Sequence, residues 1–333
     1  MISEKMCFYT LENPSGTRLT LTDAGAAVTS LTYRGVDVVL GWGDPGIYAD
    51  NPSFFGATVG RCANRTAGAA FSLDGRTWIL GRNDGLNNLH SGPDGWHARR
   101  WETADVGDDF VTFYLDSPDG DQGFPGRVRI WAMYTLTAAD RVHIRFKAVP
   151  ESDSILNVTN HAYFNLNGHG SGSVEGHILQ LNADSYTPCG EGLIPTGEIA
   201  DVTGTPFDFR AAHPIGRDLH GAHPQLTAAG GFDHNLCLSG SGLRTAGTLR
   251  GDKTGIVLEL ITDRPGVQFY SGNSLRGEAG KGGAIYLRHG ALCLETQCWP
   301  DAIHHESFPS PVVSAGEEWT TETVWAFRTD GGA

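Results

Sequence analysis

The stretch RVRIWAMYTLTAADRVHIRFKAV, residues 127–149, contains two runs of β-branched and aromatic residues on either side of the short sequence TAAD, residues 137–140. Runs of this length and composition are typical of β-strands, and a break of small and polar residues between two of them is typical of a turn. The stretch therefore predicts a strand, a turn and a second strand. Comparable runs recur along the chain in RLTLTDAG (18–25), AFSLDGRTWIL (70–80), DFVTFYLDSPDG (109–120) and GIVLELITDRPGVQFYSGN (255–273).

Turn signals are frequent, and helix signals are rare. In AFSLDGRTWIL the pair Asp74-Gly75 separates two strand-like runs, and an Asp-Gly pair can adopt the positive φ angles that a tight hairpin needs. The chain contains 45 glycines, about twice the usual share of ~7%. No segment of about a dozen residues combines the apolar spacing of an amphipathic helix with signals at both ends. We therefore expect many turns and little helix.

The domain organisation follows from the absence of a clear linker. The Gly/Ser stretches NGHGSGSVEG (167–176) and LSGSGLRTAG (238–247) each lead directly into another strand-like run, as loops within one domain do. The expected fold class is all-β: a single large antiparallel β-sandwich domain over residues 1–333, with its sheets packed face to face. The alternative is a pair of smaller β-domains divided near residue 150.

The overall charge excludes several classes of partner. The formal net charge is −14, with 24 Lys and Arg against 38 Asp and Glu, so the mean field repels phosphate backbones and anionic membranes. No window approaches the ~18 apolar residues of a membrane span, and the opening sequence has no apolar core of signal-peptide length. We expect a cytoplasmic protein with a small-molecule partner, no nucleic-acid or membrane partner, and a monomeric or weakly homodimeric state.

The six cysteines do not show the spacing of a zinc site. Cys293 and Cys298 are the closest pair, and four residues separate them instead of the two that zinc knuckles use. The adjacent His304 and His305 lie in a polar loop without a third ligand at a standard spacing. We therefore expect reduced, mostly buried thiols and no metal.

Five stretches carry more polar residues than their strand-like surroundings require. They are GRCANR (60–65), NNLHSG (87–92), NHAYFNL (160–166), GFDHN (231–235) and ETQCWPDA (295–302). Because they lie far apart in sequence, a joint role requires the fold to bring them together. Their candidate functional residues are Asn64, Arg65, His90, His161, Asp233 and Glu295.

Glu295 carries the strongest individual signal in this set. It follows GALCL in a run with the character of a buried strand, and a buried carboxylate without a partner costs several kcal/mol or takes up a proton. His161 taken alone is more often a structural residue than a catalyst, and Asp233 with Arg65 could be a structural ion pair.

The motifs together resemble those of the aldose 1-epimerase, or galactose mutarotase, family. GRCANR, NNLHSG, NHAYFNL, GFDHN, PGVQFYSGN and ETQCWPDA occur in the family's order and at about its spacing, over roughly residues 7–328. The resemblance implies a galactose mutarotase-type β-sandwich with an open cleft for one free sugar and no metal or organic cofactor. The implied reaction is the interconversion of the α and β anomers of aldohexoses such as glucose and galactose.

The resemblance also assigns roles to residues by motif. His161 matches the family's general acid and Glu295 its general base, while His90 matches the second, substrate-positioning histidine. The residues that match sugar-hydroxyl contacts are Asn64, Arg65, Asp233 and Gln268. The chain departs from the family pattern near the cleft rim, at Ser91, Trp96 and Trp299, which affects the expected sugar preference more than the reaction type.

These residue types suit the reaction, because ring opening needs a base at the C1 hydroxyl and an acid at the ring oxygen, and closure reverses both roles. Burial should raise the pKa of Glu295, and Arg65 should limit that rise. An aromatic ring beneath the sugar is also expected. The candidates for it are Trp96, Phe207, Tyr163 and Trp299.

Three alternative functions use the same residues differently. A hexose-phosphate epimerase would need basic residues for the phosphate, whereas Asp233 would repel it. A carbohydrate-binding protein would not need both His161 and Glu295. A glycoside hydrolase would place two carboxylates across the scissile bond, but the obvious partners here are one histidine and one carboxylate.

Overall fold

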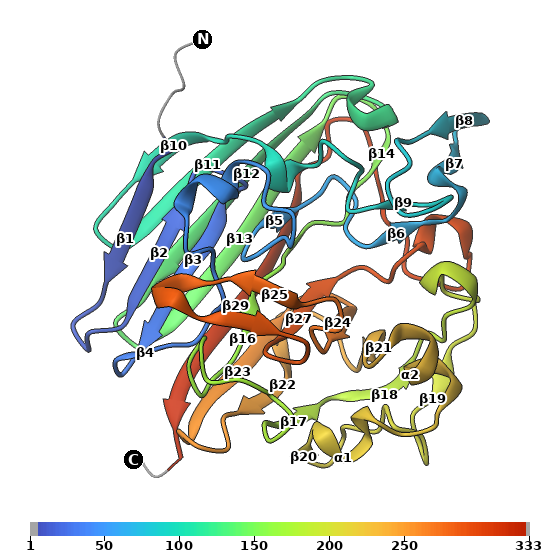
Figure 1. Ribbon diagram of the computed structural model, residues 1–333. Helices are drawn as coiled ribbons and strands as arrows, with labels where there is room; N and C mark the ends of the chain where they lie inside the picture. The colour runs from blue at the N-terminus through green and yellow to red at the C-terminus, as the bar shows by residue number, and fades with distance from the viewer. Residues whose placement is uncertain (1–5, 331–333) are drawn as a thin grey trace.

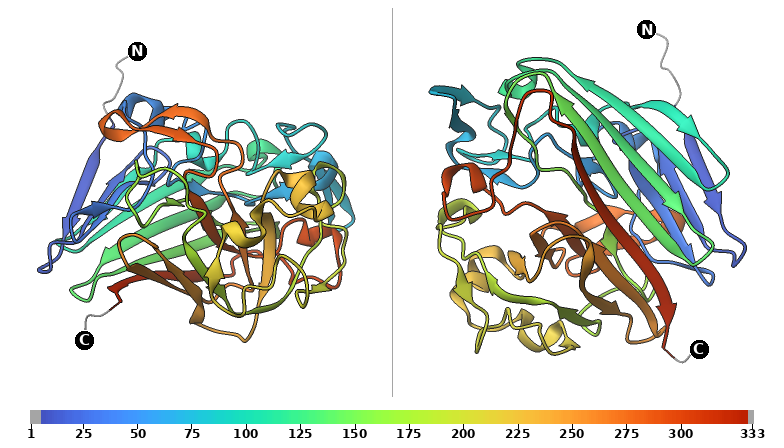
Figure 2. Two further views of the ribbon diagram at one scale, coloured as in Figure 1. Left: turned by 60° about the horizontal axis from the view of Figure 1, so that its bottom comes forward. Right: turned by 180° about the vertical axis from the view of Figure 1, so that it is seen from behind.

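A computed structural model describes residues 6–330, and its largest element is a nine-stranded antiparallel sheet (Figure 1). In spatial order its strands are β10 (Glu102–Val106), β11 (Phe110–Ser117), β12 (Val128–Leu136), β13 (Arg141–Pro150), β29 (Trp319–Thr329), β23 (Ile256–Thr262), β22 (Arg244–Arg250), β17 (Ile178–Leu181) and β20 (His213–Pro214). Seen from behind, the long C-terminal strand β29 runs beside β13 (Figure 2). The sheet thus joins strands from both halves of the chain.

The stretch 127–149 forms the centre of one half of this sheet. Strands β12 and β13 pair from Val128↔Pro150 to Leu136↔Val142, and the turn between them places Asp140 at φ 56°. Along β12 buried residues alternate with residues that are more exposed, because successive side chains of a strand point to opposite faces. One face therefore packs into the core and the other faces solvent.

A six-stranded sheet and a four-stranded sheet complete the main architecture. The six-stranded sheet has the order β16 (Tyr163–Phe164), β27 (Leu292–Gln297), β24 (Gly266–Tyr270), β21 (Asp233–Leu238), β18 (Ala183–Tyr186) and β19 (Ala200–Asp201). The four-stranded sheet consists of β1 (Phe8–Glu12), β2 (Arg18–Thr22), β3 (Ala27–Tyr33) and β4 (Val36–Asp37). Buried side chains of the three sheets form one contiguous hydrophobic cluster.

Short two-stranded pairs and turns connect these sheets. The pairs are β5 (Thr58–Val59) with β15 (Thr159–Asn160), β6 (Arg65–Thr66) with β9 (Asn88–Leu89), β7 (Ala70–Leu73) with β8 (Arg76–Ile79), β14 (Ser154–Ile155) with β28 (Val312–Val313), and β25 (Arg276–Ala279) with β26 (Ile285–Leu287). The α-helices are α1 (Gly216–Leu219) and α2 (Pro224–Ala229). Single 3₁₀ turns span Pro45–Ala49, Ala67–Ala69, Trp96–Ala98, Asp121–Gly123, Glu191–Leu193, Lys281–Gly283 and Ala302–His304.

The local predictions agree with the structure. Asp74 and Gly75 have φ angles of 53° and 72° in the β7–β8 hairpin. Within residues 6–330, helix is confined to α1 and α2 apart from the 3₁₀ turns. Within the part of the chain that the structure describes, Cys62, Cys189, Cys237, Cys293 and Cys298 are free thiols. No helix among residues 6–330 has the length and apolar character to cross a membrane.

Candidate active site

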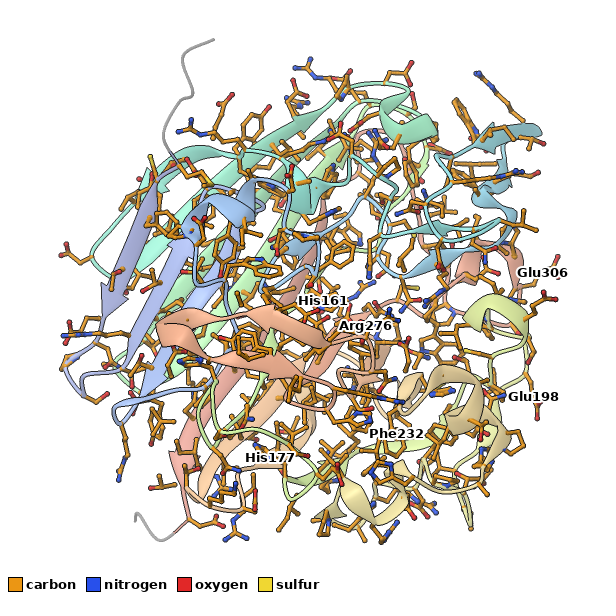
Figure 3. The ribbon with its side chains drawn as sticks, in the orientation of Figure 1. His161, His177, Glu198, Phe232, Arg276 and Glu306 are labelled. Carbon is orange, nitrogen blue, oxygen red and sulfur yellow. The ribbon has the colours of Figure 1, made fainter. Side chains whose placement is uncertain are left out.

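A cavity of about 390 Å³ gathers six of the seven site residues expected from the sequence. This volume lies within the ~300–1,000 Å³ range of small-molecule sites. Figure 3 shows two of the lining residues, His161 and Arg276, near the middle of the molecule. The lining consists of Phe54, Asn64, Arg65, Leu89, His90, His161, Tyr163, Leu193, Ala229, Asp233, Tyr270, Asn273, Ser274, Arg276 and Glu295.

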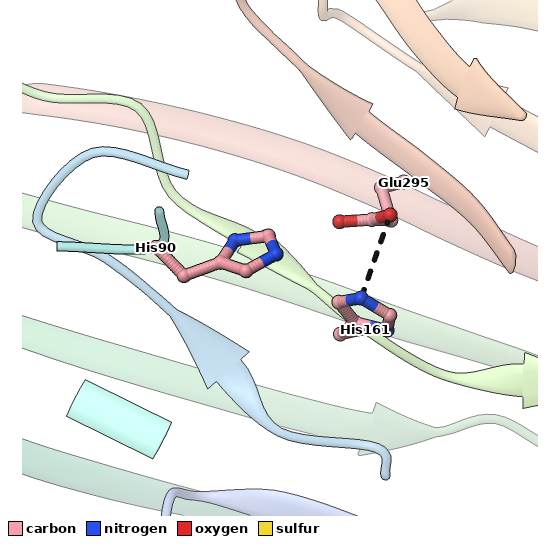
Figure 4. A group of neighbouring side chains, drawn as sticks. All are labelled: His90, His161 and Glu295. Carbon is pink, nitrogen blue, oxygen red and sulfur yellow. Dashed lines mark ion pairs between the residues drawn. The ribbon is translucent and has the colours of Figure 1, made fainter. Parts of the chain in front are cut away.

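His161 and Glu295 face each other in this cavity (Figure 4). Nε2 of His161 lies 3.7 Å from Oε1 of Glu295, and both side chains are buried. Glu295 is held within the six-stranded sheet, where β27 lies between β16 and β24 and pairs with β24 through Gln268↔Glu295. The main chain of His161 is fixed by hydrogen bonds with Ala57 and Gly56. The buried strand expected around Glu295 is therefore present.

Burial raises the pKa of Glu295 and lowers that of His161, so that the order of the two values is reversed. It raises the pKa of Glu295 well above its ordinary value; Asp233 adds to the rise, and Arg65 opposes it. It lowers the pKa of His161 to about 4. Both expected directions for Glu295 agree with the structure. These shifts favour the neutral pair, with the proton on the Glu295 carboxyl and His161 neutral.

His90 is held as a hydrogen-bond donor toward the cavity. Its Nδ1 accepts a hydrogen bond from the main-chain N–H of Asn64 at 3.1 Å, while its own main-chain N–H donates to the Asn64 carbonyl. Burial keeps the pKa of His90 well below its ordinary value, so the ring is neutral at pH 7 and its proton must lie on Nε2. The motifs ANR and NNLHSG are thus joined by these bonds and by the β6–β9 pair.

Arg65 and Asp233 form an ion pair and also line the cavity. Arg65 pairs with Asp84 at 2.8 Å and with Asp233 at 3.9 Å, and both Arg65 and Asp233 line the cavity. Gln268 does not line the cavity; its Nε2 donates a hydrogen bond to Oδ1 of Asp233 at 2.7 Å. Gln268 therefore orients Asp233.

The aromatic lining differs from the expectation in part. Of the four aromatic candidates, Tyr163 lines the cavity. The other three candidates do not line it: Trp96 packs against Trp101, Phe207 stacks on Tyr186, and Trp299 packs against Phe308. The three rings are used in packing that sequence spacing does not reveal.

Phe54 is a lining residue that the sequence analysis missed. Its ring lies 5.6 Å from that of His161 and 4.8 Å from that of His90, between centroids. It stands in NPSFFG, residues 51–56, a turn in which its φ is 59°. The two adjacent phenylalanines in this turn are the one feature of the sequence that could have indicated an exposed ring. The stretch contains no polar motif that points to a site.

Among the residues that the structure describes, one set of side chains has the types and proximity of metal ligands: one donor atom each of His90, His161 and Glu295 lie within 4.8 Å of one another. The tautomer of His90 makes this a poor donor set, because Nδ1 is occupied by Asn64 N–H and Nε2 carries the proton. The other candidate pair, His304 and His305, instead contacts Asp301 at 2.6 and 3.5 Å.

The chain is similar to known sugar epimerases over nearly its whole length. A family model described as aldose 1-epimerase matches residues 8–326. The galactose mutarotase of Bos taurus is 42% identical over 317 residues, which cover 93% of this chain and 91% of the relative. The aldose 1-epimerase of Escherichia coli K12 is 38% identical over 327 residues, covering 96% and 94%.

Solved structures give the same result for the fold. The aldose epimerase homologue of C. elegans superposes with a TM-score of 0.91 at 30% identity, covering 98% of this chain and 99% of that one. The galactose 1-epimerase of Lactobacillus acidophilus superposes with a TM-score of 0.86 at 27% identity, with the same coverage.

Proposed function

The chain belongs to the aldose 1-epimerase family, and we propose that His161 and Glu295 are the acid–base pair with which it interconverts the anomers of a free aldohexose. The activity is that of a mutarotase, an isomerase acting on sugars such as glucose and galactose. The observation that carries the assignment of the pair is its geometry: a buried imidazole and a buried carboxyl, 3.7 Å apart, face one cavity.

The reaction needs one proton removed and one delivered. The reactive form is the ion pair, which arises from the neutral pair when the proton of Glu295 moves to Nε2 of His161 across the 3.7 Å between them. In the ring-opening half, the Glu295 carboxylate then takes the proton of the C1 hydroxyl, and Nε2–H of His161 gives a proton to the ring oxygen as the C1–O5 bond breaks. The products are the open-chain aldehyde, protonated Glu295 and neutral His161. Rotation about C1–C2 exposes the other carbonyl face, and closure returns both protons along the same routes.

Burial of the pair lowers the cost of this exchange. In water an ionised glutamate beside a protonated histidine is the more stable arrangement, because the ordinary pKa values are about 4.3 and about 6.5. Burial raises the pKa of Glu295 and lowers that of His161, which disfavours the charged arrangement. The neutral pair that exists after ring opening is thereby closer in free energy to the ion pair that exists before it.

The other lining residues are proposed to grip the sugar. His90 offers Nε2–H, Asp233 offers carboxylate oxygens, and Asn64 and Arg65 offer further polar atoms. A buried group left unpaired by a wrong sugar costs about 1–3 kcal/mol. Because one chain supplies this whole set, we propose that a monomer or a weak homodimer is sufficient for activity.

Polarimetry of freshly dissolved α-glucose or α-galactose tests the function. With the protein, optical rotation should decay to the same final value as in buffer, but with a rate constant that rises in proportion to protein concentration. Binding of the sugar without faster decay would identify a carbohydrate-binding protein instead. Release of sugar from an aryl glycoside would identify a hydrolase.

A further inference from the structure

The side of the His161 ring that faces away from Glu295 contacts a thiol. Sγ of Cys293 lies 3.5 Å from Nδ1 of His161, and both residues are buried. Cys293 and Glu295 are two residues apart on β27, so their side chains project to the same face of the strand. One strand therefore contacts both nitrogens of the imidazole.

Ring packing fixes the plane of His161 but does not decide which nitrogen points where. The rings of Phe54 and Tyr163 both stack on His161, with interplanar angles of 21° and 25°. A stacked ring can rotate by 180° about its Cβ–Cγ bond without losing these contacts. Only a directional interaction at the ring edge distinguishes the two orientations, and Cys293 provides one.

The proposed chemistry requires a particular tautomer of His161. After Nε2 has delivered its proton to the ring oxygen, that atom must keep a lone pair so that it can take the proton back during closure. The remaining ring proton must then stay on Nδ1. The sulfur at 3.5 Å is in position to accept the Nδ1–H hydrogen bond.

Resting on the proposed function, we propose that Cys293 is a positioning residue whose sulfur accepts a hydrogen bond from Nδ1–H of His161 and so leaves Nε2 as the one ring atom that exchanges a proton. His90 has the opposite arrangement, since its Nδ1 accepts a hydrogen bond and its Nε2–H donates. His90 thus serves as a fixed hydrogen-bond donor, and His161 carries the proton.

Sulfur is a suitable acceptor for this role. It is a weak one, so it orients the ring without strongly stabilising the imidazolium, whereas a carboxylate at the same position would hold the proton on the ring. Burial raises the pKa of Cys293 well above its ordinary value, so the group remains a neutral thiol at pH 7. The ring of His161 can then release its Nε2 proton readily.

The first test reads the tautomer directly in the resting protein. Long-range ¹H–¹⁵N NMR of the wild-type protein at pH 7 should show His161 with a protonated Nδ1 and an unprotonated Nε2, and His90 with the reverse. A His161 signal with the proton on Nε2 would overturn the proposal, whatever the activity measurements show.

The second test uses three cysteine variants and polarimetry. Cys293→Ala should lower kcat by about 5-fold or more, the effect of losing one hydrogen bond, with little change in KM. Cys293→Ser retains an acceptor and should restore most of the activity. Cys237→Ala, a buried thiol on β21 that does not line the cavity, is the matched control and should leave kcat unchanged.

The outcomes separate this inference from the proposed function. The role of Cys293 would be overturned if Cys293→Ala kept the kcat and the NMR spectrum of the wild-type protein. It would also be overturned if the Ser and Ala variants lost kcat equally. Neither result would contradict the acid–base pair. Full activity in a Glu295→Gln variant would instead overturn the acid–base pair itself.

Discussion

Two histidines of the same cavity differ because of what each Nδ1 contacts. His90 receives the Asn64 main-chain N–H, whereas His161 meets the sulfur of Cys293. In the proposed mechanism these contacts, and not the residue type, decide which ring carries a proton through the catalytic cycle. Functional assignments at the scale of single residues therefore depend on hydrogen-bond partners that are far away in sequence.

Removing either member of the acid–base pair should abolish most of the activity. Glu295→Gln and His161→Asn should each lower kcat by about 10²–10⁴-fold, the usual range for a general acid or base. Neither should lower thermal stability much, because each replaces a group by a neutral one of similar size. Polarimetric kcat and thermal denaturation of both variants check this expectation, and near-full turnover in either variant would contradict that residue's role.

Asp233 should favour free sugars over sugar phosphates. It lines the cavity, accepts a hydrogen bond from Gln268 and lies 3.9 Å from Arg65, so an ionised phosphate beside it would meet like-charge repulsion. Asp233→Asn should raise KM for glucose about 10-fold, the effect of weakening one buried hydrogen bond to a charged group, and leave the ring-opening pair intact.

The check on Asp233 is kcat/KM for glucose and for glucose 6-phosphate in both proteins. If the wild-type protein processes the phosphate as well as the free sugar, the inferred electrostatics of the cavity are wrong. Arg276, which lines the same cavity, is then the first residue to examine as a phosphate ligand.

Dialysis against a strong chelator should leave the rate of mutarotation unchanged, because the pair transfers protons without a Lewis acid and the tautomer of His90 disfavours coordination. Polarimetry before and after dialysis measures this. Loss of activity that a divalent cation restores would identify His90, His161 and Glu295 as a metal site.

At the scale of elements, the site depends on how short loops are tied to the sheets. Buried Arg61, in the loop that leads to Asn64 and Arg65, donates to the carbonyls of Pro125 and Gly126 at 2.8 Å and to Ser117 Oγ at 2.6 Å. Burial lowers its pKa to about 10. One side chain thus joins this loop to the connection between β11 and β12.

Arg61→Met should lower the free energy of unfolding by about 3 kcal/mol, since it leaves several buried acceptors unpaired. The matched control is Arg127→Met, because Arg127 is 45% exposed and pairs with Asp116 at the surface, where an ion pair contributes at most about 1 kcal/mol. Urea denaturation of both variants measures the difference. Equal losses would show that the buried contacts of Arg61 do not stabilise the fold.

At the scale of the whole molecule, burial of histidine should make the fold sensitive to acid. Burial lowers the pKa of His97, His161 and His177 to about 4 and that of His234 to about 3, and holds that of His90 well below its ordinary value. In the unfolded chain these groups titrate near 6.5. Between about pH 6.5 and 4 the unfolded chain therefore binds their protons and the native state does not.

Two buried carboxyls act in the opposite direction. The pKa values of Asp233 and Glu295 are raised mainly by burial, so the native state holds their protons over part of this range. The histidines with lowered pKa values outnumber these two carboxyls, so the unfolded chain takes up more protons than the native state as the pH falls through this range. Each net proton changes the free energy of unfolding by about 1.4 kcal/mol per pH unit.

Stability should therefore fall by about 3 kcal/mol or more between pH 7 and pH 5. Urea denaturation at the two pH values and constant ionic strength measures it, and an unchanged or higher stability at pH 5 would contradict the assignment of these buried histidines as neutral.

We further propose that residues 1–333 form one domain, for which every curve should show a single transition, because the main hydrophobic cluster includes residues from Leu11 to Phe327.

The sequence by itself determined the local elements and the identity of most site residues. The β12–β13 hairpin follows from the composition of residues 127–149, and the β7–β8 turn follows from Asp74-Gly75, because strand and turn preferences act between neighbours in the chain. The buried position of Glu295 follows from the apolar run that precedes it. Motif order then identified the family without knowledge of distances.

Only the tertiary structure decided which side chains meet. Phe54 in the cavity wall, Gln268 behind Asp233, and Cys293 against His161 could not be read from spacing. These contacts join residues up to 132 positions apart, and the pairing and register of strands decide them. Since a shift of one residue in register would turn β27 over and move Glu295 to its other face, the site exists only once the sheets have formed.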